Sequence, residues 1–242
     1  MVSRKDTVFS TPLGHIDDFE FNAQVADVFE NMIQRSVPGY ALLLEMIGML
    51  TGTYARAGTN CYDLGCSLGA STLKIRQNLP GDCVVIGIDS SEAMVEKCIG
   101  NIHRDHSQAK VTIRLEDLQD TIIENASMVV MNFTLQFIAD EKRSAVLKRI
   151  VDGINEGGVL ILSEKIKFDD TARQELMTGL HLEFKKHHGY SDLEIAQKRA
   201  SLENVLVPNT TAEHIGRLKA AGFSTVELIV RCLNFVSFLA IK

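Results

Sequence analysis

The apolar positions of this chain alternate between two patterns. Residues 83–89 and 127–133 form almost continuous apolar runs, which parallel strands buried on both faces require. Other stretches, such as residues 25–33, have apolar residues every three to four positions, and these are typical of helices. Strands and helices in alternation predict the α/β class, with a mostly parallel sheet.

The region after the strand that ends at Lys165 is longer than one crossover helix requires. Ser191 and Glu194 have the spacing of a capping box, which predicts that a new helix begins there and divides the region in two. A second capping box, Thr210 with Glu213, opens the last helix. We therefore expect a helical insert over residues 167–208, placed before the last helix.

The glycines after residue 155 and the β-rich end of the chain predict further helix and strand boundaries. We expect a helix over residues 140–155, a turn at Glu156-Gly157-Gly158 and a strand over residues 159–165. Residues 224–241 contain two β-rich runs divided near Leu233-Asn234. They predict a C-terminal antiparallel hairpin.

Composition indicates a single globular domain over residues 1–242, with an N-terminal arm and helices in residues 1–55. Of the 242 residues, 45% are hydrophobic and 23% are charged, and no apolar run approaches the roughly 20 residues of a membrane span. The N-terminus lacks the apolar segment of a secretory signal, and the five cysteines form no Cys-x-x-Cys pair. We predict a cytoplasmic protein with reduced thiols and no membrane contact.

Charge and ligand spacing narrow the classes of partner. The net charge of −6 disfavours direct binding to a nucleic-acid backbone. No pair of histidines, cysteines or carboxylates has the spacing of metal ligands in a predicted element, so we expect no metal site.

The strongest candidate for chemistry is the glycine turn in residues 62–69, which follows a predicted strand and precedes a helix. Its Asp-x-Gly-x-x-x-Gly spacing is neither that of a dinucleotide fingerprint nor that of a P-loop. Gly65 lets the backbone approach a ligand, and Gly69 permits close helix packing. Asp63 would repel a phosphate but favour a cation. The turn predicts a nucleoside site near Gly65, although a tight strand-to-helix connection also explains it.

Polar residues follow the next three strands. Asp89 ends the second strand, 20 residues after Gly69, where it can accept both ribose hydroxyls or else cap the following helix. Asp117 and Leu118 follow the third strand and suit adenine recognition, or form a solvated loop. Asn132 ends the fourth strand, at the edge where open α/β sheets hold their chemistry.

Three other features each have a functional and a plain interpretation. Tyr40 begins a helix after Pro38-Gly39, where it either packs or covers a ligand. Cys66 fits a small packing residue better than a nucleophile, because no histidine is nearby in sequence. The basic pairs Lys185-Lys186 and Lys198-Arg199 are typical of solvated helix faces.

Several motifs, in this order, resemble the carboxy-S-adenosyl-L-methionine synthases of the S-adenosylmethionine-dependent methyltransferase-like superfamily. The resemblance covers nearly the whole chain and includes one motif from the insert. The motifs are Ser36-Val37-Pro38-Gly39-Tyr40, Tyr62-Asp63-Leu64-Gly65-Cys66-Ser67-Leu68-Gly69, Glu124-Asn125-Ala126-Ser127-Met128-Val129-Val130, Asn132-Phe133-Thr134-Leu135-Gln136-Phe137 and Ser191-x-x-Glu194-Ile195-x-Gln197-Lys198-Arg199.

This resemblance implies a Rossmann-like seven-stranded methyltransferase fold and a homodimer. It implies an enzyme that converts S-adenosylmethionine and prephenate to carboxy-S-adenosylmethionine and phenylpyruvate, without a metal. A separate tRNA carboxymethyltransferase would then use the product on a wobble uridine.

The resemblance also implies the residues of the site. Tyr40 and Arg199 are expected to be catalytic. Ser90 departs from the asparagine expected after Asp89. The residues expected to contact the ligand are Tyr40, Gly65, Cys66, Ser67, Asp89, Ser90, Asp117, Leu118, Asn132 and Arg199.

The residues alone leave two other functions open. One is a methyltransferase that acts on a small acidic substrate. The other is a non-catalytic S-adenosylmethionine-binding partner of a tRNA-modifying enzyme, docked through Lys185-Lys186. No side chain in the sequence stands out as the base that takes a proton from the cofactor methyl group.

Overall fold

A single seven-stranded sheet organises the protein, in a computed structural model that describes residues 4–242; residues 1–3 of the predicted arm lie outside the described residues. The strand order is β3-β2-β1-β4-β5-β7-β6, and β7 runs antiparallel to both of its neighbours. The strands are β1 (Asn60–Leu64), β2 (Val84–Asp89), β3 (Lys110–Leu115), β4 (Ala126–Asn132), β5 (Ile154–Lys165), β6 (Thr225–Cys232) and β7 (Phe235–Ile241). The predicted sheet and C-terminal hairpin are confirmed.

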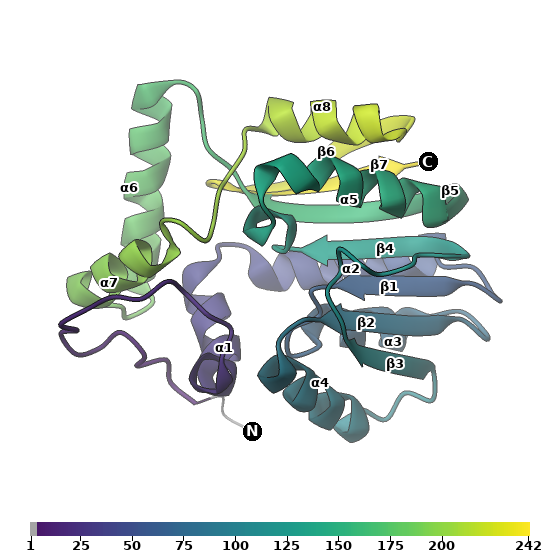
Figure 1. Ribbon diagram of the computed structural model, residues 1–242, viewed down its shortest axis with the longest axis horizontal. Helices are drawn as coiled ribbons and strands as arrows, with labels where there is room; N and C mark the ends of the chain where they lie inside the picture. The colour runs from purple at the N-terminus through teal and green to yellow at the C-terminus, as the bar shows by residue number, and fades with distance from the viewer. Residues whose placement is uncertain (1–3) are drawn as a thin grey trace.

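Helices cover both faces of this sheet (Figure 1). Apolar residues of α5 and α8 pack on one face, and those of α2 and α3 pack on the other. The helices are α1 (Ala23–Ser36), α2 (Tyr40–Tyr54), α3 (Ala70–Asn78), α4 (Glu92–Arg104), α5 (Asp140–Gly153), α6 (Thr171–His187), α7 (Asp192–Leu202) and α8 (Thr211–Ala221). Over residues 4–242, no helix combines the length and the apolarity needed to cross a membrane.

The insert and the N-terminal segment lie side by side, beyond the carboxyl ends of the parallel strands (Figure 1). Both capping boxes form and begin α7 and α8. Gln197 of α7 donates hydrogen bonds to the carbonyls of Phe9 and Thr11, each at 2.9 Å, and accepts one from the backbone N–H of Leu13. These bonds hold the N-terminal segment against the insert.

Two details of the expected fold were wrong. The strand β5 begins at Ile154 rather than at residue 159, so residues 156–158 lie within a strand instead of forming a turn. Gly157 has a φ of +69° there, and the register between β4 and β5 shifts, so a bulge accommodates the glycines. The alternation of strands and helices also fails once, because residues 116–125 between β3 and β4 contain no helix.

Candidate functional site

A cavity of about 700 Å³ opens at the carboxyl ends of the parallel strands, bounded by α1, α2 and the insert. It lies where open α/β sheets bind their ligands, and its volume is within the usual range for such sites. Nine of the ten expected site residues line it: Tyr40, Gly65, Cys66, Ser67, Asp89, Ser90, Asp117, Leu118 and Asn132. Arg199 does not; it is exposed on α7.

The glycine turn requires both of its glycines. Gly65 has a φ of +80°, and a Cβ there would lie 2.4 Å from Oγ1 of Thr134 in the loop after β4. Gly69 has a φ of +86°, and its Cβ would lie 2.7 Å from Sγ of Cys98 on α4. Any other residue would strain the backbone and push these neighbours apart. Gly69 therefore brings α3 close to α4, and Gly65 brings β1 close to the β4 loop.

Asp89 connects the glycine turn to the end of β2. Its Oδ2 accepts from the backbone N–H of Ser67 at 2.8 Å, and its Oδ1 accepts from that of Ser91 at 2.9 Å. Ser91, not Asp89, caps α4 with its side chain. Each carboxylate oxygen retains a free acceptor position. Asp89 is thus held in the cavity wall with capacity for two hydroxyl donors.

Asp117 and Asn132 sit at the ends of β3 and β4. Oδ1 of Asp117 accepts from the backbone N–H of Gln119 at 2.8 Å. Nδ2 of Asn132 donates to Oγ of Ser71 at 3.1 Å, whereas its buried Oδ1 has no partner among the described residues. An unpartnered buried acceptor in a cavity wall is satisfied when a ligand supplies a donor.

Asp63 lies buried beneath the glycine turn. Thr72 donates a hydrogen bond to its Oδ2 at 2.6 Å, and its Oδ1 has no partner among residues 4–242. Burial raises the pKa of Asp63 to about 7. Burial also raises the pKa of Tyr40, and the charge of Asp63 raises it further. The floor of the cavity near Tyr40 is therefore suited to a cationic ligand group.

Cys66 is not activated as a nucleophile. A hydrogen bond with Cys98, followed by burial, raises the pKa of the Cys66 thiol. A thiol that stays protonated is a poor nucleophile. The raised pKa is consistent with the interpretation of Cys66 as a small packing residue rather than a nucleophile.

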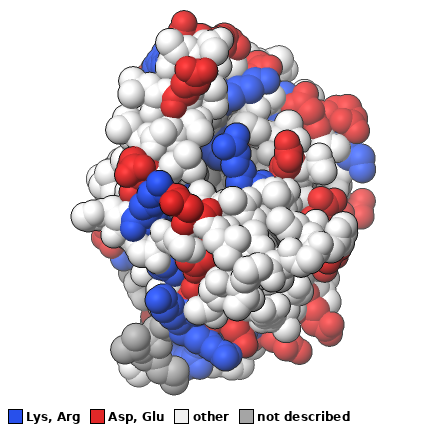
Figure 2. All heavy atoms as spheres, turned by 90° about the vertical axis from the view of Figure 1, so that its left-hand side faces the viewer, with Lys and Arg blue, Asp and Glu red and all other residues white. Residues whose placement is uncertain are grey.

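Three lysines of the cavity wall were missed by sequence reasoning. Lys165 at the end of β5, Lys185 on α6 and Lys198 on α7 all line the cavity. Their sequence neighbours Lys186 and Arg199 are exposed. Figure 2 shows Lys and Arg side chains within a hollow on this face of the molecule. Adjacent positions on a helix point about 100° apart, so one member of each basic pair lines the cavity and the other is exposed.

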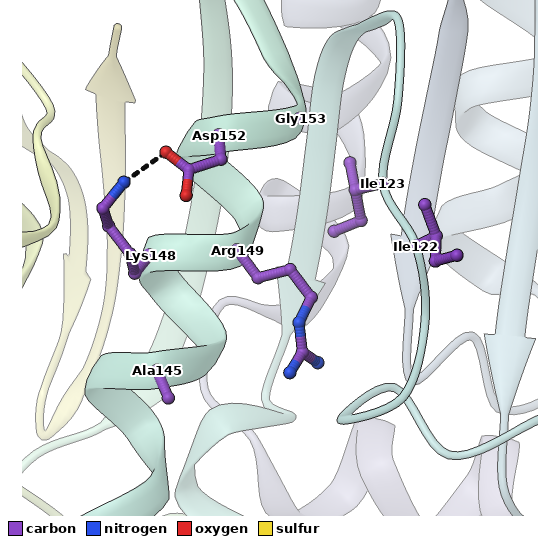
Figure 3. Close-up of a pocket in the computed structure, with 7 residues that line it drawn as sticks. All are labelled: Ile122, Ile123, Ala145, Lys148, Arg149, Asp152 and Gly153. Atoms are coloured by element: carbon purple, nitrogen blue, oxygen red, sulfur yellow. Dashed lines mark hydrogen bonds and ion pairs between the residues drawn. The ribbon is translucent and has the colours of Figure 1, made fainter.

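A second depression, near Ile122 and Ile123, has none of these features (Figure 3). It lies beside the start of β4 and the end of α5, at the sheet edge opposite the glycine turn. Lys148 and Asp152 pair with each other along α5. We therefore assign function to the cavity at the carboxyl ends.

The sheet order, the glycine turn and the acids at the ends of β2 and β3 define an S-adenosylmethionine-dependent methyltransferase fold. A family model described as a methyltransferase domain matches residues 62–158. The fold is similar to that of an O-methyltransferase family protein from Burkholderia thailandensis, with a TM-score of 0.63 and 16% identity. That likeness covers 92% of this chain and 60% of the other.

Relatives that match this chain over its whole length identify its family within the methyltransferase fold. The chain is 54% identical to the carboxy-S-adenosyl-L-methionine synthase of Hahella chejuensis, over 100% of both chains. It is 52% identical to the protein of the same name from Marinobacter nauticus, over 98% of this chain and 95% of the other. The chain belongs to the carboxy-S-adenosyl-L-methionine synthase family, as the motifs predicted.

Proposed function

We propose that this protein converts S-adenosylmethionine and prephenate to carboxy-S-adenosylmethionine and phenylpyruvate. The observation that carries the proposal is the division of one cavity into two ends. Acids suited to an adenosine lie at β2 and β3, and lysines suited to carboxylates lie at β5 and the insert. Methyl transfer to a neutral acceptor has no need of a lysine-lined second end.

The reaction balances with the substrates alone. The bond from the prephenate ring to its carboxylate breaks and releases carbon dioxide, and the electron pair aromatises the ring and expels the ring hydroxyl as hydroxide. This hydroxide takes a proton from the sulfonium methyl group and becomes water. The resulting ylide carbon forms a bond with carbon dioxide. Prephenate thus supplies both the carboxyl group and the base, which fits the absence of an obvious protein base.

The protein's residues would hold the reactants in line for these steps. Asp89 would accept from the ribose hydroxyls, and Asp117 with Leu118 would hold the adenine. Tyr40 stays protonated, because burial raises its pKa, and would donate its hydroxyl hydrogen inside the cavity. Arg199 is exposed on α7 outside the cavity lining, but its charge acts on Lys165 and Lys185, and we propose that its guanidinium turns towards the cavity and pairs with the new carboxylate through two parallel N–H groups.

Mass spectrometry of the nucleoside that copurifies with the protein tests this function. We expect carboxy-S-adenosylmethionine, and we expect purified protein to form it from S-adenosylmethionine only when prephenate is added. S-adenosylhomocysteine as the sole bound nucleoside, with no product from prephenate, would instead favour a methyltransferase. A bound nucleoside without any turnover would favour a non-catalytic partner.

The cellular setting follows from the same proposal. The enzyme would work in the cytoplasm and supply its product to a separate tRNA carboxymethyltransferase, without binding nucleic acid itself. We also expect a homodimer. Leu176 and Leu180 of α6 are exposed side chains one helical turn apart, and a second subunit would cover them. Light scattering at micromolar concentration should give twice the chain mass; a monomer mass would refute the dimer.

The ribose role of Asp89 gives a separate prediction. Asp89→Ala should weaken S-adenosylmethionine binding by about 1–3 kcal/mol, because charge-assisted hydrogen bonds to the ribose are lost. The matched control is Ser91→Ala, which removes the cap of α4 and costs about 1 kcal/mol of stability. Calorimetric titration should show a loss of affinity in the first variant only. Equal affinities in both variants would leave Asp89 as a structural residue.

A further inference from the structure

Three lysine side chains from three different elements converge on one end of the cavity. Lys165 lies at the end of β5, and the insert supplies Lys185 and Lys198. Across residues 4–242, none of the three forms an ion pair, and the only hydrogen bond from their ammonium groups runs from Nζ of Lys198 to Oγ of Ser36, at 3.2 Å. We call these three residues the lysine cluster.

Burial and mutual repulsion make this arrangement costly without a ligand. Burial lowers the pKa of Lys198 to about 7 and that of Lys185 to about 8. The charges of neighbouring Lys185 and Arg35 lower the first further, and those of Lys165 and Arg199 lower the second, whereas Asp6 alone opposes the shift at Lys198. Buried cations without counter-charges are retained where a bound anion supplies them.

The acids of the cavity wall lie elsewhere. They are on α1, at the end of α4 and after β2 and β3, namely Glu30, Asp89, Asp105, Glu116 and Asp117. The positive end and the acidic end of the cavity are therefore separate. From β2 to β5 the sheet order crosses three strand spacings, so the two ends lie about 14 Å apart across the sheet. A nucleoside at β2 and β3 leaves the lysine end to another molecule or group.

An aromatic wall adjoins the lysine cluster. Phe133 and Phe235 both line the cavity, with ring centroids 5.8 Å apart. His181 packs on Phe235, at 4.9 Å between ring centroids, and its Nε2 lies 2.8 Å from the Ser36 carbonyl. Burial lowers the pKa of His181 to about 3, so this ring is neutral at pH 7 and adds no charge. The wall offers apolar ring surface to a planar or nearly planar six-membered ring.

We propose that Lys165, Lys185 and Lys198, together with the Phe133–Phe235 wall, form the subsite for a ring dicarboxylate, the second substrate. This inference rests on the proposed function, in which that dicarboxylate is prephenate. The ammonium groups would pair with its carboxylates while the aromatic rings contact its six-membered ring. Arg199 is separate from the subsite and remains available to the carboxylate formed on the cofactor.

The charge of the ligand falls during the reaction, which gives the subsite a role in turnover. Prephenate carries two carboxylates, and phenylpyruvate carries one. A cluster of cations holds the dianion more tightly than the monoanion, so decarboxylation itself loosens the bound ring. The subsite therefore favours entry of the substrate and departure of the product.

Binding to the protein loaded with S-adenosylhomocysteine tests the subsite without turnover, because that nucleoside has no methyl group to carboxylate. Prephenate is titrated by calorimetry against wild type, Lys165→Gln and Lys185→Gln, and against the control Lys186→Gln. Lys186 is adjacent to Lys185 but exposed, and it pairs with Asp192 and Glu183. We expect each cluster variant to lose about tenfold or more in prephenate affinity, and the control to stay within about twofold of wild type.

Two further titrations identify what the cluster holds. S-adenosylhomocysteine itself should bind the cluster variants as tightly as it binds wild type, and phenylpyruvate should bind wild type about tenfold more weakly than prephenate does. Prephenate affinity unchanged in both variants, or no prephenate binding to wild type, would overturn the subsite. A parallel loss of nucleoside affinity would also overturn it, because the lysines would then hold the methionine carboxylate. If these titrations succeed but no carboxylated product forms, the proposed function fails while the subsite stands.

Discussion

Asp63→Asn is expected to stabilise the ligand-free protein and to weaken its binding of S-adenosylmethionine. Asp63 is fully buried with one oxygen unpartnered, so its ionised form is costly in the empty protein. The same charge attracts the sulfonium and ammonium of the cofactor through a low-dielectric wall. The variant should lose on the order of 2 kcal/mol of binding free energy, measured by calorimetry near pH 8.

The stability gain has a defined pH window. Burial raises the pKa of Asp63 from about 3.8 to about 7 in the folded protein. The folded state therefore holds this proton more tightly than the unfolded state does. In wild type, the stability that the protonated carboxyl contributes is fully present below about pH 4 and is lost as pH rises towards 7. At pH 8 the asparagine variant should exceed wild type by about 1–3 kcal/mol in urea unfolding, whereas the difference should be small at low pH.

The difference between the unfolding free energies of wild type and Asp63→Asn, taken at each pH, isolates the contribution of Asp63 from that of other buried acids. Glu164 also has a pKa raised by burial, to about 8, and it is present in both proteins. Asp82→Asn, an exposed acid at the start of β2, serves as the control and should change neither stability nor binding. A variant that binds S-adenosylmethionine as tightly as wild type would show that Asp63 supports only the turn.

Local patterns along the chain were sufficient to predict most of the fold. The strand β2 lies within the apolar run of residues 83–89 that predicts it, and both capping boxes begin their helices where expected. These signals act over a few residues and depend on local backbone geometry. The start of β5 was missed because Gly157-Gly158, a pair that usually indicates a turn, instead forms a bulge within the strand.

The acidic end of the cavity was predictable because strand ends meet at one edge of a parallel sheet. Asp89 and Asp117 therefore fall into one cavity by topology alone. The lysine end was not, because it depends on how the insert packs. Lys185 and Lys186 read as one solvated pair, and only the rotation of α6 shows which of them faces inward. A charged residue at the end of β5, Lys165, was the one local signal available.

Arg199 distinguishes a carboxylated ligand from a methylated one. Its side chain makes no ion pair or hydrogen bond within the described part of the chain, so both edges of the guanidinium are free. It is exposed on α7, next to the cavity-lining Lys198, and its charge lowers the pKa of both Lys165 and Lys185. It is thus positioned close enough to the lysine end for its field to act there.

Arg199→Gln is expected to weaken binding of carboxy-S-adenosylmethionine by about 2–4 kcal/mol, because both the charge and the paired N–H donors are lost. Arg199→Lys keeps the charge but loses the two parallel N–H donors, and should weaken binding of carboxy-S-adenosylmethionine by about 1–3 kcal/mol. S-adenosylmethionine carries a neutral methyl group at the same position, so its affinity should remain within experimental error in both variants. Competition titration of the two ligands against each protein measures these differences. Equal losses of affinity for both ligands would show that Arg199 does not bind the carboxylate. No loss for either ligand would show that Arg199 is only a solvated residue of α7.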